Sequence, residues 1–167
     1  IKAMEELGIL HDTSTPHRHE TNGVIERAVR RDREGTSACL VQSGLNEEGW
    51  DKATQCYCFL RNIVDLLIDG ETTWKKRFNE EFSGPLVAFG AEVLYKPSSD
   101  DDIKRTFKFR NKLLPGIFVG YACHAGGGWG GDLLLIDQEE FNVAEHRSEV
   151  IIKRNKAGEV HVVKDDD

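Results

Sequence analysis

The stretch Asn22-Gly23-Val24-Ile25-Glu26-Arg27 predicts a turn followed by a helix, with a carboxylate in the first turn of that helix. Asn-Gly is a turn sequence. The residues after it, up to about Ser43, have the apolar spacing of an amphipathic helix. A carboxylate at Glu26 can serve as a metal ligand, and the neighbouring turn lets the backbone approach a bulky anionic substrate.

The predicted helix 23–43 has two distinct faces. Its apolar arc contains Val24, Ile25, Ala28, Val29, Thr36, Cys39 and Leu40. A polar stripe on the opposite side consists of Glu26, Arg30, Arg33 and Ser37. Gly44 follows the last turn and is typical of a C-terminal cap.

The rest of the chain divides into a helical part and a strand-rich part. A helix end at 2–7 and a short strand at 9–14 precede the helix 23–43, and further helices are predicted at 47–68 and 71–82. After Gly84-Pro85 the pattern becomes that of strands, at 86–95, 116–123, 132–136, 149–153 and 159–163. The sequence therefore predicts a helical part over residues 1–82 and a small β-rich module over residues 86–163.

Composition and charge exclude several classes of protein. The 167 residues are 39% hydrophobic and 31% charged, as in folded globular proteins. No apolar run approaches the roughly 20 residues that cross a bilayer, so we expect no membrane partner. The net charge of −7 argues against nucleic-acid binding through overall charge, and any DNA contact must rest on a local patch. The chain does not begin with methionine, and we expect it to be a fragment of a longer protein.

Three other groups of residues have both a functional and a structural interpretation. The four cysteines lack zinc-finger spacing and suit reduced thiols in a core, which favours an intracellular location. His17 and His19 could bind zinc, but the spacing supplies no third ligand. The basic stretch 104–112 could touch nucleic acid or form a solvated strand face. The glycine-rich run 126–131 lacks the lysine and Ser/Thr of a phosphate-binding loop and indicates a hairpin.

Two sets of residues, in order along the chain, resemble a known family. The first set is Pro16, the stretch 22–27, Gly44-Leu45 and Trp50. The second set is Val87-Ala88-Phe89-Gly90 and the stretch from Lys112 to Tyr121, Lys-Leu-Leu-Pro-Gly-Ile-Phe-Val-Gly-Tyr. Together they resemble the end of the integrase catalytic core of copia-type retrotransposons and the region just downstream of that core.

The resemblance implies a fold, a reaction and a site. The fold would be the C-terminal portion of a ribonuclease-H-like α/β core, followed by a small β-barrel-like domain. Such integrases use two aspartates and one glutamate to bind two divalent ions, Mg²⁺ or Mn²⁺, for DNA 3′-processing and strand transfer. Carried onto this sequence, the catalytic and metal-binding glutamate is Glu26. The residues that would contact DNA are Asn22, Gly23, Arg27, Arg30 and Arg33.

The same resemblance predicts that this chain alone is inactive. The two aspartates would lie upstream, and a single carboxylate cannot hold two metal ions, so we expect no bound metal here. DNA would be the partner of the complete enzyme, in the nucleus or cytoplasm, and a homo-oligomer stays open. The arginines also have a structural interpretation, as a solvated face with a Glu26–Arg30 pair worth about 0.3–0.5 kcal/mol.

A non-enzymatic alternative stays open as well. Asp32 falls within the apolar arc, where the family tends to have leucine. Gly35 interrupts the same helix, at a cost of about 1 kcal/mol relative to alanine. His19 and Glu20 depart from the usual loop of the family. Such features are typical of a decayed or domesticated copy that acts as a nucleic-acid-binding or protein-binding module.

Overall fold

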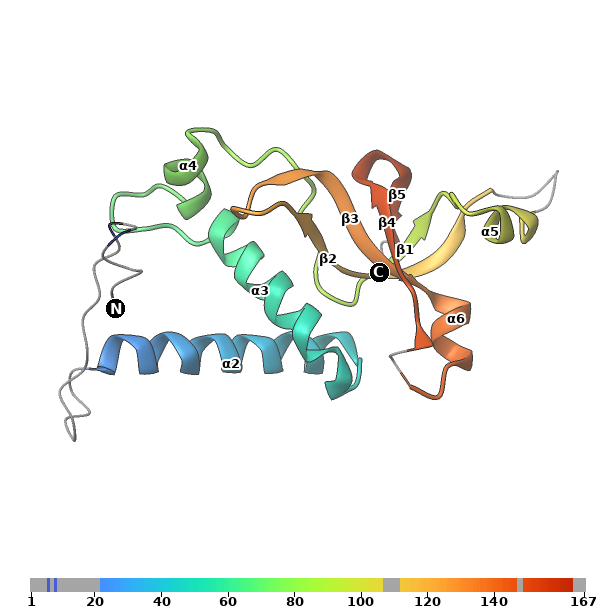
Figure 1. Ribbon diagram of the computed structural model, residues 1–167, viewed down its shortest axis with the longest axis horizontal. Helices are drawn as coiled ribbons and strands as arrows, with labels where there is room; N and C mark the ends of the chain where they lie inside the picture. The colour runs from blue at the N-terminus through green and yellow to red at the C-terminus, as the bar shows by residue number, and fades with distance from the viewer. Residues whose placement is uncertain (1–5, 7, 9–21, 107–111, 147–148, 164–167) are drawn as a thin grey trace.

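The computed structural model describes residues 6, 8, 22–106, 112–146 and 149–163. The first described elements are α2 (Gly23–Ser43), η2 (Glu47–Gly49), α3 (Trp50–Val64) and α4 (Thr73–Phe78). They are followed by β1 (Glu92–Tyr95), α5 (Asp100–Lys104), β2 (Leu114–Cys123), β3 (Trp129–Asp137), α6 (Gln138–Val143), β4 (Ile152–Lys156), η4 (Ala157–Glu159) and β5 (Val160–Val162). Helices α2, α3 and α4 lie to one side of the sheet (Figure 1), so the fold is mixed α/β.

The five strands form one antiparallel sheet in the order β4-β3-β2-β1-β5. Strands β4 and β5 are joined by η4 alone, although they occupy opposite edges of the sheet. The sheet must therefore bend strongly. Among the described residues no ladder pairs β4 with β5, so the sheet is open and the expectation of a barrel-like domain is wrong. Strand β5 has only three residues, which pair with β1 along one edge, and its other edge has no ladder partner among the described residues.

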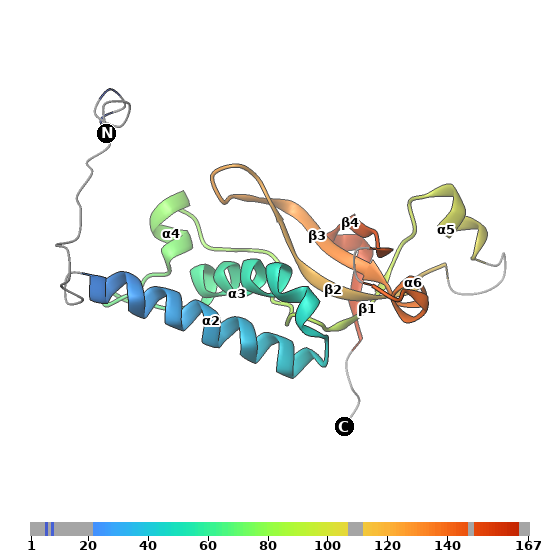
Figure 2. The same ribbon diagram turned by 60° about the horizontal axis from the view of Figure 1, so that its bottom comes forward.

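One continuous hydrophobic core connects the helices with the sheet. Helix α3 lies beside β2 in both views (Figures 1 and 2). The Phe59 ring of α3 stacks on Tyr121 of β2, with centroids 4.3 Å apart, and contacts Trp74 of α4 edge-on at 5.7 Å. The buried residues of this cluster include Ala53, Cys56, Ile63, Val87, Phe89, Val93, Phe118, Val119, Leu133 and Ile136. The division into domains 1–82 and 86–163 stays a prediction.

The segment between α4 and β1 is attached to the sheet by a side chain. The Tyr121 hydroxyl donates to the Pro85 carbonyl and accepts from the Val87 N–H, each at 2.9 Å. Gly90 then passes α2 so closely that an added Cβ would lie 2.1 Å from the Cβ of Ser43. The predicted strand 86–95 is therefore regular only from Glu92 to Tyr95, because Tyr121 satisfies backbone groups that a ladder would otherwise use.

Other elements differ from the sequence pattern for local reasons. The predicted helix 47–68 is α-helical only over Trp50–Val64, because a turn follows it. In this turn the Leu67 N–H donates to the Glu71 carbonyl, and the Gly70 N–H donates to the Leu67 carbonyl. Strand β4 lies about three residues later than expected. Helices α5 and α6 were not predicted, and Ser99 and Asp137 cap their first turns. The helix end 2–7 and strand 9–14 fall outside the described residues, apart from positions 6 and 8.

Helix α2 is packed over only part of its length. Thr36 is buried, and its hydroxyl lies 2.9 Å from that of Thr54 on α3. Toward the N-terminus the same apolar arc is uncovered, with Val24, Ile25 and Val29 exposed at 70%, 65% and 52%. The described helix therefore presents apolar surface over its first two turns. Within the described residues, no helix is both long and apolar enough to span a membrane.

The crossing of α2 and α3 depends on Gly35. A Cβ added at this position would lie 2.0 Å from Cζ of Tyr57, well inside van der Waals contact. Gly35 is therefore the point where the Tyr57 ring approaches the α2 backbone. The interpretation of Gly35 as a defect of the helix is wrong, since the missing side chain is what allows this contact.

A buried carboxylate joins four elements at the other end of the sheet. Asp137 is fully buried, and its Oδ1 accepts the Glu139 and Glu140 N–H groups that begin α6, both at 3.0 Å. Its Oδ2 accepts from the Tyr95 hydroxyl of β1 at 2.6 Å and from the Arg105 guanidinium at 3.0 Å. Burial alone raises the pKa of Asp137, but the bonds from Arg105 and Tyr95 outweigh burial and lower that pKa below its ordinary value.

We expect Gly35→Ala to destabilise the protein by roughly 1–3 kcal/mol, because overpacking against Tyr57 outweighs the gain in helix propensity. Urea denaturation measures the change in the free energy of unfolding. Ser37→Ala, at an exposed position of the same helix, should change it by less than about 0.5 kcal/mol. Adding Tyr57→Leu should relieve the clash, so that Gly35→Ala costs less in that background; an equal cost would contradict the proposed contact.

We expect Asp137→Asn to destabilise the protein by roughly 2–4 kcal/mol, because it removes the fully buried carboxylate that pairs with Arg105 and leaves only Asp102 and Glu139 for that guanidinium. Asp101→Asn, in an exposed pair with Lys104, should cost under about 1 kcal/mol. The lowered pKa gives stability that is present above about pH 4 and lost as pH falls through the folded pKa. Acid unfolding followed by circular dichroism should show a shallower loss for Asp137→Asn than for the unmodified chain.

Candidate nucleic-acid interface

The first of the predicted site residues along the sequence lie at the exposed start of α2. Asn22 is the residue before the helix, and its side chain makes no capping bond. Gly23 is the first helical residue and is partly exposed, and Glu26 lies exposed in the first turn. The turn and the carboxylate thus occupy the positions that the sequence predicts, on the part of α2 that α3 does not cover.

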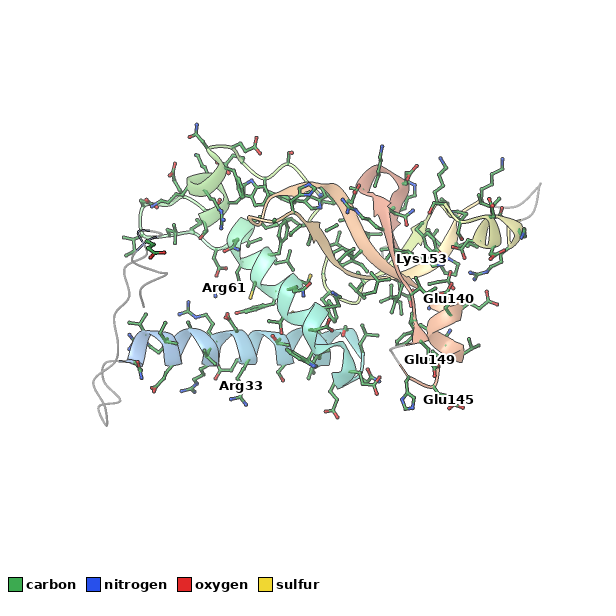
Figure 3. All side chains as sticks on the ribbon, in the orientation of Figure 1. Arg33, Arg61, Glu140, Glu145, Glu149 and Lys153 are labelled. Atoms are coloured by element: carbon green, nitrogen blue, oxygen red, sulfur yellow. The ribbon has the colours of Figure 1, made fainter. Side chains whose placement is uncertain are left out.

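The three predicted arginines are exposed, but their surroundings differ. Arg30 Nε donates to Glu34 Oε1 at 2.8 Å, one helical turn further along, and this bond raises the pKa of Arg30. Arg27 and Arg33 have no carboxylate partner within the described part of the chain. Figure 3 shows that Arg33 points away from α3 and the sheet. Arg61, which belongs to α3, lies toward the side of α2 that faces α3.

One face of α2 bounds a shallow, open groove of about 710 Å³. Its lining residues are Ile25, Glu26, Val29, Arg30, Arg33, Glu34 and Ser37. The groove includes the whole predicted polar stripe. It also includes the apolar Ile25 and Val29 and the acid Glu34, which the sequence reasoning had not placed in the site. Spacing of four residues from Arg30 could have indicated Glu34.

This face can bind phosphate through its guanidinium groups. Arginine presents a planar set of donors that matches phosphate oxygens, and Arg30 and Arg33 lie about one turn apart on one side of the helix. Ile25 and Val29 can contact the apolar parts of a ligand. The groove is open to solvent, so a long polymer could lie along it without entering a closed cavity.

The described residues do not form a metal centre. Among them, no group of three or more His, Cys, Asp or Glu side chains is placed to hold a metal ion. Glu26 alone therefore does not fit a two-ion site, and no catalytic step is assigned to it in this chain. His17 and His19, with their possible zinc site, lie outside the described residues.

A second hollow, of about 610 Å³, lies between α2 and α3. The positive and negative side chains that line it balance one another in charge. Arg61 Nε donates to Asp65 at 2.8 Å, and Arg61 Nη1 lies 3.7 Å from Asp32. The Asp32 side chain is 41% exposed. Asp32 is therefore not a buried, unpaired carboxylate, although it falls within the apolar arc, because the crossing leaves it open to water beside an arginine.

The remaining candidate groups have structural roles where they are described. Arg105 is held by Asp137, Asp102 and Glu139, and Lys104 pairs with Asp101. The basic stretch is thus engaged at its start, and residues 107–111 lie outside the described residues. The run 126–131 lies in the β2–β3 hairpin, as expected, with the His124 N–H bonded to the Gly128 carbonyl at 2.8 Å.

The four cysteines are free thiols, but only one of them is buried, so the prediction that they all pack in a core is wrong for Cys123. Cys56 is buried, and burial raises its pKa to about 12. Cys39 and Cys58 are partly buried, whereas Cys123 is exposed at the end of β2. Burial raises the pKa of Cys123 as well, so neither Cys56 nor Cys123 is an activated nucleophile.

The chain is related to a retrotransposon polyprotein. It is 32% identical over 119 residues to the Retrovirus-related Pol polyprotein from transposon TNT 1-94 of Nicotiana tabacum, a match that covers 68% of this chain. The chain spans only 8% of that polyprotein. No protein-family model matches the chain, and no solved structure matches it. The similarity is to the polyprotein, and it does not by itself identify one of the polyprotein's activities.

We expect Asp32→Leu not to raise the melting temperature, because the substitution exposes an apolar side chain and removes a partner of Arg61. Differential scanning calorimetry compares the variant with the unmodified chain. Asp51→Leu serves as a control, since Asp51 is a partly exposed acid on α3 whose one ion pair among the described residues is with Lys52, at 3.6 Å. A clear rise for Asp32→Leu only would show that the carboxylate is unfavourable where it stands.

Proposed function

We propose that the chain is the C-terminal portion of a copia-type retrotransposon integrase, in which α2 provides a DNA-contacting face. The observation that carries the proposal is the open groove on α2, where Glu26, Arg30 and Arg33 lie exposed on one side of one helix. The relationship to a retrotransposon Pol polyprotein supports the same assignment.

The electrostatics of the chain favour local rather than overall contact with DNA. The chain carries a net charge of −7, which repels a polyanion at long range. The cations on the exposed side of α2 act at short range, where salt at physiological strength screens charges more than about 8 Å away. Arg33 is well suited to make the first phosphate contact, because no acid among the described residues forms an ion pair with it.

In the proposed complete enzyme, Glu26 is one of three carboxylates that hold two divalent ions, Mg²⁺ or Mn²⁺. Those ions would supply the activation of the attacking oxygen in 3′-processing and strand transfer. The other two carboxylates would come from residues of the longer protein that lie outside this chain. The proposal therefore assigns DNA binding to this chain and catalysis to the longer protein, with Glu26 as a metal ligand only there.

The exposed start of α2 also fits a helix from a larger ribonuclease-H-like core. Val24, Ile25 and Val29 are apolar residues with no covering partner in the described part of the chain. In the proposed enzyme, strands of the same core would cover part of that surface. The β-sheet of residues 92–162 would then be the module just downstream of the core.

A second candidate function is a non-enzymatic nucleic-acid-binding module. It is favoured by the continuous core, in which α3, α4 and the sheet are packed through Phe59, Trp74 and Tyr121. Such a module would bind DNA through the same face of α2 and would carry out no reaction.

The test is binding of a 20-base-pair fluorescent duplex, measured by anisotropy over a range of salt concentrations. Arg33→Gln should weaken binding several-fold and reduce the slope of log K against log salt by about one, as expected for loss of one phosphate contact. Arg77→Gln on α4, an exposed arginine away from α2, is the matched control. Equal effects of the two variants, or no binding by the unmodified chain at low salt, would contradict the proposal.

A strand-transfer assay separates the two candidates. In a protein extended upstream, the integrase function predicts magnesium-dependent strand transfer that Glu26→Gln abolishes without loss of duplex binding. The binding module predicts duplex binding with no strand transfer in either form. Activity that survives Glu26→Gln would remove this residue from the proposed catalytic set.

A further inference from the structure

A carboxylate lies beside one of the two arginines in the proposed DNA groove. Glu34 Oε1 accepts from Arg30 Nε at 2.8 Å, and both side chains line the same groove as Arg33. Arg30 and Glu34 are 80% and 65% exposed, so water and ligands reach both groups. Arg33, three residues along the helix from Arg30, has no such neighbour within the described residues.

We propose that Glu34 acts as an internal competitor for phosphate at Arg30, so that Arg33 makes the first contact and Arg30 contributes only when Glu34 is displaced. This inference rests on the proposed DNA-binding function and specifies which residue limits its strength. The carboxylate occupies one edge of the guanidinium with the same hydrogen-bonding chemistry that a phosphate oxygen would use. Its negative charge also repels a phosphate that approaches the other donors of Arg30.

The geometry of the pair makes displacement feasible. An exposed ion pair contributes little to stability and is screened by salt. The order of the residues, with the arginine on the N-terminal side of the acid, is the less favourable orientation on a helix. A phosphodiester polymer that is already held by Arg33 could therefore compete with Glu34, whereas a single phosphate would not. The pair reduces affinity without preventing binding.

The expected consequence is that Arg30 and Arg33 contribute unequally. In the unmodified chain, removal of Arg33 should weaken DNA binding more than removal of Arg30. Once Glu34 is neutralised, Arg30 should contribute about as much as Arg33. The difference lies in the acid one turn away from Arg30, since both arginines are exposed and line the same groove.

A double-mutant cycle on the full chain tests this inference. The four proteins are the unmodified chain, Glu34→Gln, Arg30→Gln and the double variant, each titrated with the same fluorescent duplex. Glu34→Gln should tighten binding about threefold to tenfold and increase the salt slope by about one. Arg30→Gln should weaken binding less than twofold in the unmodified background, but about threefold or more in the Glu34→Gln background.

Glu80→Gln is the control for net charge, because Glu80 is an exposed acid that follows α4 and has no ion-pair partner within the described residues. If Glu34→Gln tightens binding no more than Glu80→Gln does, or if Arg30→Gln costs the same in both backgrounds, the inference is wrong. The proposed function would still stand in that case, provided that Arg33→Gln weakens binding. Absence of duplex binding by every variant would instead contradict the proposed function itself, and circular dichroism of each protein verifies that the variants are folded.

Discussion

The contact between Phe59 and Tyr121 is the interaction on which the arrangement of the two parts depends. It connects α3 with the centre of the sheet, and Tyr121 also holds the segment that runs between them through Pro85 and Val87. Helix α2 is placed mainly by α3, through Thr36 and the close approach of Tyr57 to Gly35. The position of the groove on α2 relative to the sheet therefore depends on these contacts together with the close approach of Gly90 to Ser43 at the end of α2.

The two ends of the molecule are stabilised by different kinds of interaction. Around α3 the packing is aromatic and aliphatic, whereas α5, α6 and β4 are joined by ion pairs that centre on Asp137, Asp102 and Lys153. A buried ionic cluster contributes less to stability than its number of bonds suggests, because each charge has lost its hydration. Its effect is specificity, since Asp137 fits only if β1, α5 and α6 meet at one point. Asp137 caps the first turn of α6, and Arg105, which follows α5, pairs with the same carboxylate.

The sequence predicts the regular elements well where the apolar period alone determines them. Helix α2 has the predicted bounds, with Gly44 as its left-handed cap, and the β2–β3 hairpin lies where alternation and glycines indicate. The failures arise where tertiary contacts decide the local structure. No local signal could show that Tyr121 would bond to Pro85 and Val87, or that Arg105 would reach Asp137. Nor could it show that β4 and β5, which pair with β3 and β1, would form no described ladder with each other. The site follows the same pattern, because helix spacing indicates the stripe of Glu26, Arg30 and Arg33. The same spacing places both Glu26 and Glu34 four residues from Arg30, so it does not show that Arg30 donates to Glu34.

Gly35 and Asp32 show how far a local rule can mislead about function. By helix propensity and by the apolar arc, both residues indicate decay of an ancestral sequence. In the folded chain, Gly35 makes room for Tyr57, and Asp32 faces Arg61 at the rim of the same crossing. The crossing in turn leaves the opposite side of α2 open, where Arg33 points away from the rest of the molecule (Figure 3). The acids Glu140, Glu145 and Glu149 lie near α6, away from Arg33 in the same view. A chain of net negative charge can therefore offer exposed guanidinium groups on this side of α2, although Glu26 and Glu34 line the same groove as Arg30 and Arg33.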